Sequence, residues 1–105
     1  MASIELIYDA TCPNVPAARD RLSEVLASLG MTEGWREWER SSPEAPAYAL
    51  DYGSPTILVN GEDVAGATGN VGRGACRVYV DPESRRFEGV PSAAALRAVI
   101  ERHRA

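Results

Sequence analysis

The pattern of apolar and polar positions predicts a strand followed by a helix at the start of the chain. Residues 4–8 form a short apolar run with one charged position, which is typical of a strand buried on both faces. Further along, apolar residues recur at three- and four-residue steps until Gly30. This spacing predicts an amphipathic helix with Cys12 at or near its N-cap, Pro13 in its first position, and a buried stripe of Val15, Ala18, Leu22, Val25, Leu26 and Leu29.

The middle of the chain predicts two strands and a short helix. Residues 35–40 are too polar for a central strand, so they are expected at the edge of a sheet. A break at Ser41-Ser42-Pro43 is followed by a short helix through residues 48–50. The β-branched run within residues 53–61 ends in Asn60-Gly61, which is a typical turn pair, and it predicts a second buried strand.

The last third of the chain predicts a loop, a strand and a helix. Glycine is frequent over residues 61–75, which indicates an extended loop before a strand over residues 76–80. Pro91-Ser92 then begins a helix whose buried positions are Leu96, Val99 and Ile100. Near its end, His103 suits the negative end of the helix dipole, which is a sufficient reason for its presence.

This order of elements predicts an α/β domain with a four-stranded mixed sheet flanked by helices. The first two strands are joined through a helix and should be parallel, with a right-handed crossover. The strands expected over residues 53–61 and 76–80 should form an antiparallel pair joined by the glycine-rich loop. The 105 residues, of which 45% are hydrophobic, can supply the core of one domain spanning residues 1–105.

Charge and hydropathy exclude some partners. A net charge of −4 argues against nucleic acid, because surfaces that neutralise phosphates carry an excess of lysine and arginine. The first eight residues do not resemble a signal peptide, and no apolar stretch approaches the roughly 20 residues that cross a bilayer. We therefore expect a cytoplasmic protein without membrane contact, in which the two cysteines do not form a purely structural disulfide.

Two short motifs carry a resemblance to a known family. Cys12-Pro13-Asn14-Val15 opens the first predicted helix, and Ser54-Pro55-Thr56 opens a later strand. Together with the order of elements, they resemble the thioredoxin and glutaredoxin superfamily over nearly the whole chain. The resemblance implies a thioredoxin-like fold in which Pro55 follows a cis peptide bond and packs beside Cys12. The family motif has a second cysteine where this chain has Val15, which leaves a single-thiol mechanism.

The two cysteines allow different interpretations. The thiolate is the reactive form of cysteine, and a helix start stabilises it, so we expect a lowered pKa for Cys12 unless the nearby Asp9 carboxylate opposes it. The alternative is that Cys12 is a small residue filling a turn. Cys76 is either a small buried hydrophobic residue or, if the glycine-rich loop folds back, a resolving thiol or the second ligand of a two-thiolate site.

Residues that could hold an anionic substrate form a further group. The glycines around Arg73 lack the Lys-Ser/Thr of a phosphate-binding loop, which favours a flexible loop, yet Arg73 and Arg77 could hold an anionic thiol. The resemblance to glutaredoxins implies glutathione contacts at Ser54, Pro55, Gly89 and Ser92. No zinc-ligand spacing, Ser/His/Asp set or Walker sequence is present.

Three functions remain open from the sequence. The first is thiol–disulfide redox chemistry, in which Cys12 forms a mixed disulfide with glutathione or a protein thiol. The second is binding of a soft metal such as mercury by Cys12, alone or with Cys76. The chain is also similar to small bacterial thioredoxin-like proteins that are sometimes labelled alkylmercury lyase-like. The third is a non-catalytic interaction module or homodimer, with the edge strand and Trp35 and Trp38 as the contact surface.

Overall fold

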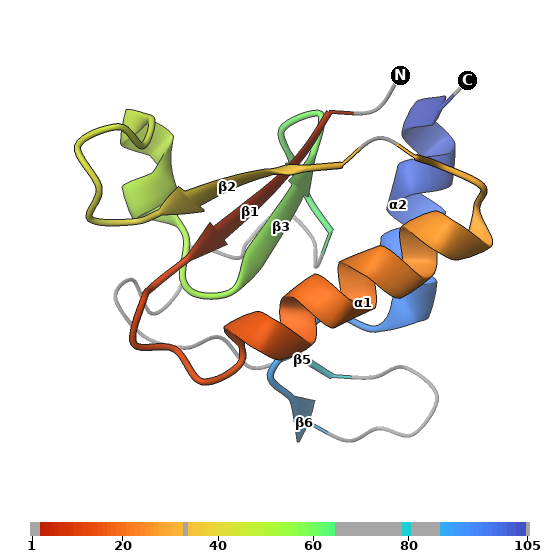
Figure 1. The fold of residues 1–105 in the computed structure, drawn as a ribbon, viewed down its shortest axis with the longest axis horizontal. Helices are drawn as coiled ribbons and strands as arrows, with labels where there is room; N and C mark the ends of the chain where they lie inside the picture. Colours follow the sequence, from red (N-terminus) through yellow and green to blue (C-terminus); the bar gives the residue numbers. More distant parts are fainter. Residues whose placement is uncertain (1–2, 33, 65–78, 81–86, 105) are drawn as a thin grey trace.

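The chain forms a mixed α/β structure (Figure 1). The computed structural model describes residues 3–32, 34–64, 79–80 and 87–104. In chain order the elements are β1 (Ile4–Tyr8), α1 (Val15–Ser28), β2 (Arg36–Glu39), the 3-10 helix η1 (Ala47–Asp51), β3 (Thr56–Val59), β4 (Glu62–Asp63), β5 (Tyr79–Val80), β6 (Phe87–Glu88) and α2 (Ala93–Arg104). The predicted α/β class is therefore confirmed.

The main sheet contains four strands in the order β2-β1-β3-β4. β1 pairs in parallel with β2, with Leu6 opposite Glu37, and antiparallel with β3, with Leu6 opposite Ile57. The predicted parallel first pair is confirmed, and so is the edge position of the second strand. That position suits β2 because its exposed and half-buried polar side chains would be costly in the centre of a sheet.

Both α-helices pack against one face of this sheet. Alternate residues of a strand point to opposite faces, so Leu6 and Ile57 face the helices while Ile7 and Leu58 face away from them. Figure 1 shows α1 and α2 lying next to one another beside the strands. The main core consists of Ile4, Leu6, Ala18, Leu22, Val25, Leu26, Ile57, Val59, Val64, Val90, Leu96, Val99 and Ile100.

The opposite face of the sheet carries a smaller core under η1. Ala49 of this 3-10 helix is fully buried against Ile7 and Leu58, with Trp38 and Tyr52 partly buried beside them. This confirms the predicted short helix, and it shows that Trp38 covers apolar surface rather than lying free for a partner. Trp35 packs against the main core on the other face, so the two tryptophans do not form one exposed contact pair.

Of the strand predicted over residues 76–80 the structure describes Tyr79–Val80, and this part is not the antiparallel partner of the strand over residues 53–61 that we expected. Asn60 and Gly61 both have positive φ, of 51° and 85°, which is the backbone of a two-residue hairpin turn. The chain therefore reverses at once, and β4 pairs with β3. Tyr79–Val80 pairs instead with Phe87–Glu88 in a separate two-stranded sheet. Most of the expected glycine-rich loop lies outside the described residues.

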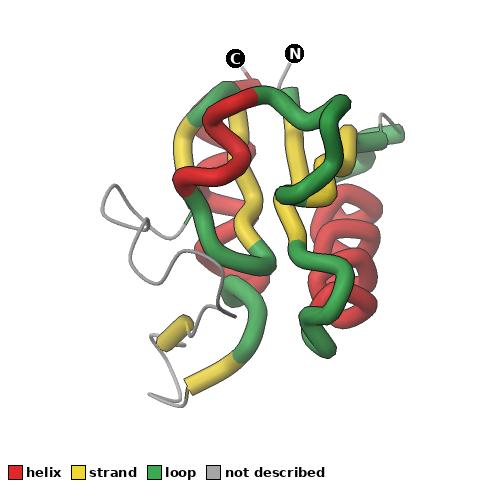
Figure 2. Tube along the Cα trace, turned by 90° about the vertical axis from the view of Figure 1, so that its left-hand side faces the viewer, coloured by secondary structure: helices red, strands yellow, loops and turns green. Residues whose placement is uncertain are grey.

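The two ends of the sheet have different surroundings. The start of β1 and the end of α2 lie at one end of the molecule (Figure 2), where Arg102 and His103 contact Glu62 on β4. The loop that follows β1 and the loop that precedes β3 meet at the other end (Figure 1). None of the helices in the described ranges is long and apolar enough to span a bilayer.

Candidate functional site

The loop after β1 forms a compact turn that positions Cys12. The Cys12 N–H donates to the Asp9 carbonyl oxygen at 2.9 Å. Within this turn, one carboxylate oxygen of Asp9 accepts hydrogen bonds from the N–H of Thr11 at 3.0 Å and from its hydroxyl at 2.8 Å. Aspartate is favoured in turns because its side chain can bond the backbone two residues on. The turn therefore brings Cys12 back toward the sheet.

Ser54 joins this turn to the start of β3. Its hydroxyl oxygen accepts the N–H of Asp9 at 2.9 Å, and its carbonyl oxygen lies 3.7 Å from the Cys12 sulfur, which donates to it. The peptide bond between Ser54 and Pro55 is cis, as expected. The two motifs, which are 42 residues apart in the chain, therefore meet at the Cys12 thiol.

The prediction that Pro13 begins the helix was wrong. The N-cap of α1 is Asn14, and the proline of the first turn is Pro16. The turn closed by the Cys12 N–H delays the helix, whose first hydrogen bond runs from Ala18 to the Asn14 carbonyl. Cys12 consequently lies two residues before the N-cap. The first turn of α1 contains no acidic residue, so a negative charge beside this helix end meets no like charge from the helix itself.

The Asp9 carboxylate does not cap α1, because Thr11 binds it instead. These hydrogen bonds, first the one from the Thr11 backbone, lower the pKa of Asp9, and the positive charge of Arg40 acts in the same direction. The carboxylate is thus ionised at neutral pH and held in the turn.

A surface pocket of about 420 Å³ opens beside Cys12. Cys12 itself is only 6% exposed, and it is one of the residues in the wall of this pocket, which is open to solvent. Among the described residues Arg19 is the one charged residue in the lining, whose described members are Tyr8, Ala10, Thr11, Cys12, Pro13, Val15, Pro16 and Arg19. The pocket therefore combines a thiol, an aromatic ring and a cation.

Arg19 is held in place from two sides. Its Nε and Nη2 donate to the two carboxylate oxygens of Glu37, at 3.0 and 2.9 Å, and its guanidinium lies 5.5 Å from the centre of the Tyr8 ring. The Arg19 hydrogen bonds lower the pKa of Glu37, and a hydrogen bond from the Trp35 indole contributes in the same direction. Such a bidentate, stacked arginine keeps a defined orientation.

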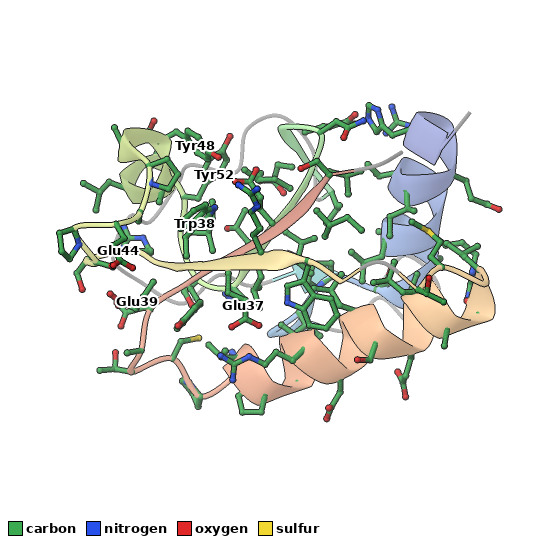
Figure 3. The ribbon with its side chains drawn as sticks, turned by 45° about the horizontal axis from the view of Figure 1, so that its top comes forward. Glu37, Trp38, Glu39, Glu44, Tyr48 and Tyr52 are labelled. Carbon is green, nitrogen blue, oxygen red and sulfur yellow. The ribbon has the colours of Figure 1, made fainter. Side chains whose placement is uncertain are left out.

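β2 supplies the acidic side chains on this side of the molecule. Figure 3 shows Glu37 and Glu39 on one face of the strand and Trp38 on the other. Glu37 binds Arg19, and Glu39 accepts the N–H of Ala10 at 3.2 Å, so it holds the loop that leads to Cys12. Neither of these two glutamates lines the pocket.

Two of the residues expected to bind glutathione, Gly89 and Ser92, differ in their surroundings. Gly89 lies so close to Asn14 that an added Cβ would fall 2.6 Å from Asn14 Oδ1 and nearer still to Cγ and Nδ2. Ser92 caps α2, since its hydroxyl accepts the N–H of Ala95 at 3.1 Å. Gly89 therefore adjoins the start of α1, while the Ser92 hydroxyl is engaged in its own helix.

The remaining predicted residues divide between the site and the undescribed part of the chain. Pro13 lines the pocket, and the Thr56 hydroxyl donates to the Gly53 carbonyl at 2.8 Å inside the protein. Arg73, Cys76 and Arg77 lie outside the described residues.

Tyr8 and Arg19 were not among the predicted site residues. Arg19 follows Cys12 by seven residues, or about two helical turns, but this spacing could not have located Arg19 because Cys12 lies outside α1. The Glu37 contact that orients Arg19 depends on tertiary structure.

No match to this chain was found among protein-family models, curated proteins or solved structures. Within the described ranges, no group of three or more histidine, cysteine, aspartate and glutamate side chains is arranged to hold a metal ion.

Proposed function

We propose that this chain is a thiol–disulfide redox protein with a thioredoxin-like fold, in which Cys12 forms a mixed disulfide with a low-molecular-weight or protein thiol. One observation carries the proposal. The Cys12 sulfur lies 3.7 Å from the Ser54 carbonyl oxygen, and Cys12 is one of the residues that line a pocket open to solvent. A cysteine that attacks an external disulfide must be accessible to a molecule in solvent, and a position in the wall of an open pocket meets this requirement.

The order of elements supports the thioredoxin-like assignment. A β1-α1-β2 unit with parallel strands is followed by the antiparallel β3-β4 pair and a final helix, α2. The Cys12 thiol contacts the carbonyl oxygen of Ser54, whose peptide bond to Pro55 is cis, and this supports the assignment. The proposal retains the cytoplasmic location expected from the sequence, where thiols are reduced and available as reaction partners.

The proposed reaction proceeds by two exchanges. The Cys12 thiolate attacks one sulfur of an external disulfide, the old S–S bond breaks, and the other sulfur leaves as a thiolate that takes a proton from solvent. A second external thiolate then attacks the substrate sulfur of the mixed disulfide and forms a new external disulfide with it, and Cys12 leaves as a thiolate. The external thiol is needed because the position of the second motif cysteine is Val15, which is buried at 5% exposure. Cys76 is the alternative resolving thiol.

The test uses glutathione disulfide with the wild type, Cys12→Ser and Cys76→Ser. We expect intact-mass spectrometry to find one glutathione on the wild type and on Cys76→Ser, none on Cys12→Ser, and complete removal by reduced glutathione. Adduct formation only at Cys76, or none at all while the unfolded protein is modified, would exclude the proposal. Retention of mercury without adduct formation would favour the soft-metal alternative.

A further inference from the structure

The pocket beside Cys12 contains hydrogen-bond donors that the fold does not use. Arg19 has five N–H groups, and its bonds to Glu37 use one on Nε and one on Nη2. Among the described residues, Nη1 has no partner, and neither does the hydroxyl of Tyr8. Both residues line the pocket, and the Arg19 side chain is 44% exposed. The spare donors therefore remain available to a ligand.

The arrangement favours an anionic ligand over a cationic one. Among the described residues no acidic side chain lines the pocket, although Glu37 and Glu39 on β2 and Asp9, which binds Thr11, are close by. Glu37 is paired with Arg19 and also accepts the Trp35 indole at 2.9 Å, and Glu39 accepts the Ala10 N–H. These contacts direct the carboxylates to protein donors. They also hold the guanidinium still, which reduces the entropy lost when a ligand binds.

The size of the pocket limits the ligand to a small molecule. Its volume of about 420 Å³ lies toward the lower end of the range for small-molecule sites, about 300–1,000 Å³. A low-molecular-weight disulfide that has a carboxylate near its sulfur would fit both the reacting sulfur and the carboxylate into one such pocket.

We propose that Arg19 selects the substrate of Cys12 by binding a carboxylate of small anionic disulfides through Nη1, with the Tyr8 hydroxyl as a second donor. This inference rests on the proposed function, because it assigns a substrate class to the same thiol. The bond changes are those of the first exchange step. Arg19 binds the substrate and exchanges neither protons nor electrons with it.

The experiment compares two disulfide probes in a Cys76→Ser background, where Cys12 is the only cysteine. Dithiobis(nitrobenzoate) carries carboxylates, whereas dithiodipyridine is neutral at neutral pH. We expect Arg19→Gln to slow the reaction of Cys12 with the anionic probe by about fivefold, the loss expected for one partly exposed charged contact. The rate with the neutral probe should change less than twofold. In the protein that retains Arg19, added salt should lower the ratio of the rate with the anionic probe to the rate with the neutral probe, because salt screens exposed charges.

Glu37→Gln is the matched control. Both substitutions remove the Arg19–Glu37 ion pair, but only Arg19→Gln removes the cation. We expect Glu37→Gln to slow the reaction with the anionic probe less than Arg19→Gln does, because the cation remains although its orientation is no longer fixed by Glu37. The double variant should remain slow, which shows that the loss does not arise from an unpaired Glu37.

The outcomes separate this inference from the proposed function. If Cys12 reacts with the neutral probe but Arg19→Gln leaves the ratio of the two rates unchanged, the selectivity proposal is wrong and the redox proposal stands. Equal slowing by Arg19→Gln and Glu37→Gln would also overturn the selectivity proposal, since it would trace the effect to the ion pair. A Cys12 that reacts with neither probe would exclude both proposals.

Discussion

Replacing Gly89 by alanine tests whether the segment before α2 packs against the start of α1. An alanine Cβ would lie 2.6 Å from Asn14 Oδ1 and closer to two other atoms of that side chain, so the Asn14 side chain must rotate away or one of the two segments must move. Overpacking of this kind costs about 1–3 kcal/mol. Alanine would otherwise be favourable at a position with ordinary backbone angles, by about 0.4–1 kcal/mol. The net expectation for Gly89→Ala is therefore a loss of about 1–2 kcal/mol.

Asn14→Ala supplies the control because it deletes all three atoms in the way of the new Cβ. Asn14 is the N-cap of α1 but makes no side-chain capping hydrogen bond, so its replacement alone should cost less than about 0.5 kcal/mol. In the Asn14→Ala background, Gly89→Ala should be neutral or stabilising. The coupling energy of the double-mutant cycle should consequently exceed about 1 kcal/mol.

Urea denaturation of the four proteins, followed by the fluorescence of the partly buried Trp35 and Trp38, measures this cycle. The urea midpoints of the four proteins are compared with one common slope of unfolding free energy against urea concentration, because free energies extrapolated to zero urea carry about 10–15% uncertainty. Additive effects of the two substitutions would refute the reasoning. They would mean that an added Cβ at residue 89 does not meet the Asn14 side chain.

Two further predictions concern titrating groups. The Tyr48 hydroxyl donates to the Glu5 carboxylate, and this bond raises the pKa of Tyr48 to about 12. In an ultraviolet titration of the four tyrosines, one should ionise near that value and return toward about 10 in Glu5→Gln, and an unchanged titration would exclude the contact. Hydrogen bonds from His103 and Arg102 lower the pKa of Glu62 in the folded protein. The ionised Glu62 therefore stabilises the fold fully at pH values above the pKa of an unfolded glutamate, and this stabilisation is lost as the pH falls through the lower pKa of the folded state. Urea unfolding at neutral and at acid pH should therefore show a smaller acid-induced loss for Glu62→Gln than for the wild type, and equal losses would contradict this contribution.

Local patterns were sufficient for most of the helices and strands. The stripe from Val15 to Leu26 has helical spacing and is buried as predicted, because burial of an amphipathic helix follows from its own periodicity. Asn60-Gly61 predicted the turn that ends β3. The sequence did not reveal that Glu62–Asp63 would pair with β3, since such a short strand has no period of its own.

The start of α1 shows why a motif can locate a site without locating an element boundary. Pro13 is compatible with a first helical position, but it is equally compatible with a turn, and the Asp9 carbonyl decided between them by accepting the Cys12 N–H. Helix termini depend on single hydrogen bonds of this kind. The element itself depends on many residues, and was therefore easier to predict.

The sequence by itself determined the α/β class, the amphipathic faces and the candidacy of Cys12 and Pro55, because these depend on residue types and on spacings of a few positions. The tertiary structure decided which groups surround Cys12. Ser54 reaches the thiol from 42 residues away, Glu37 orients Arg19 from 18 residues away, and Gly89 adjoins Asn14. No local pattern encodes such contacts, because they form only when β2, β3 and the segment before α2 pack around the same end of α1.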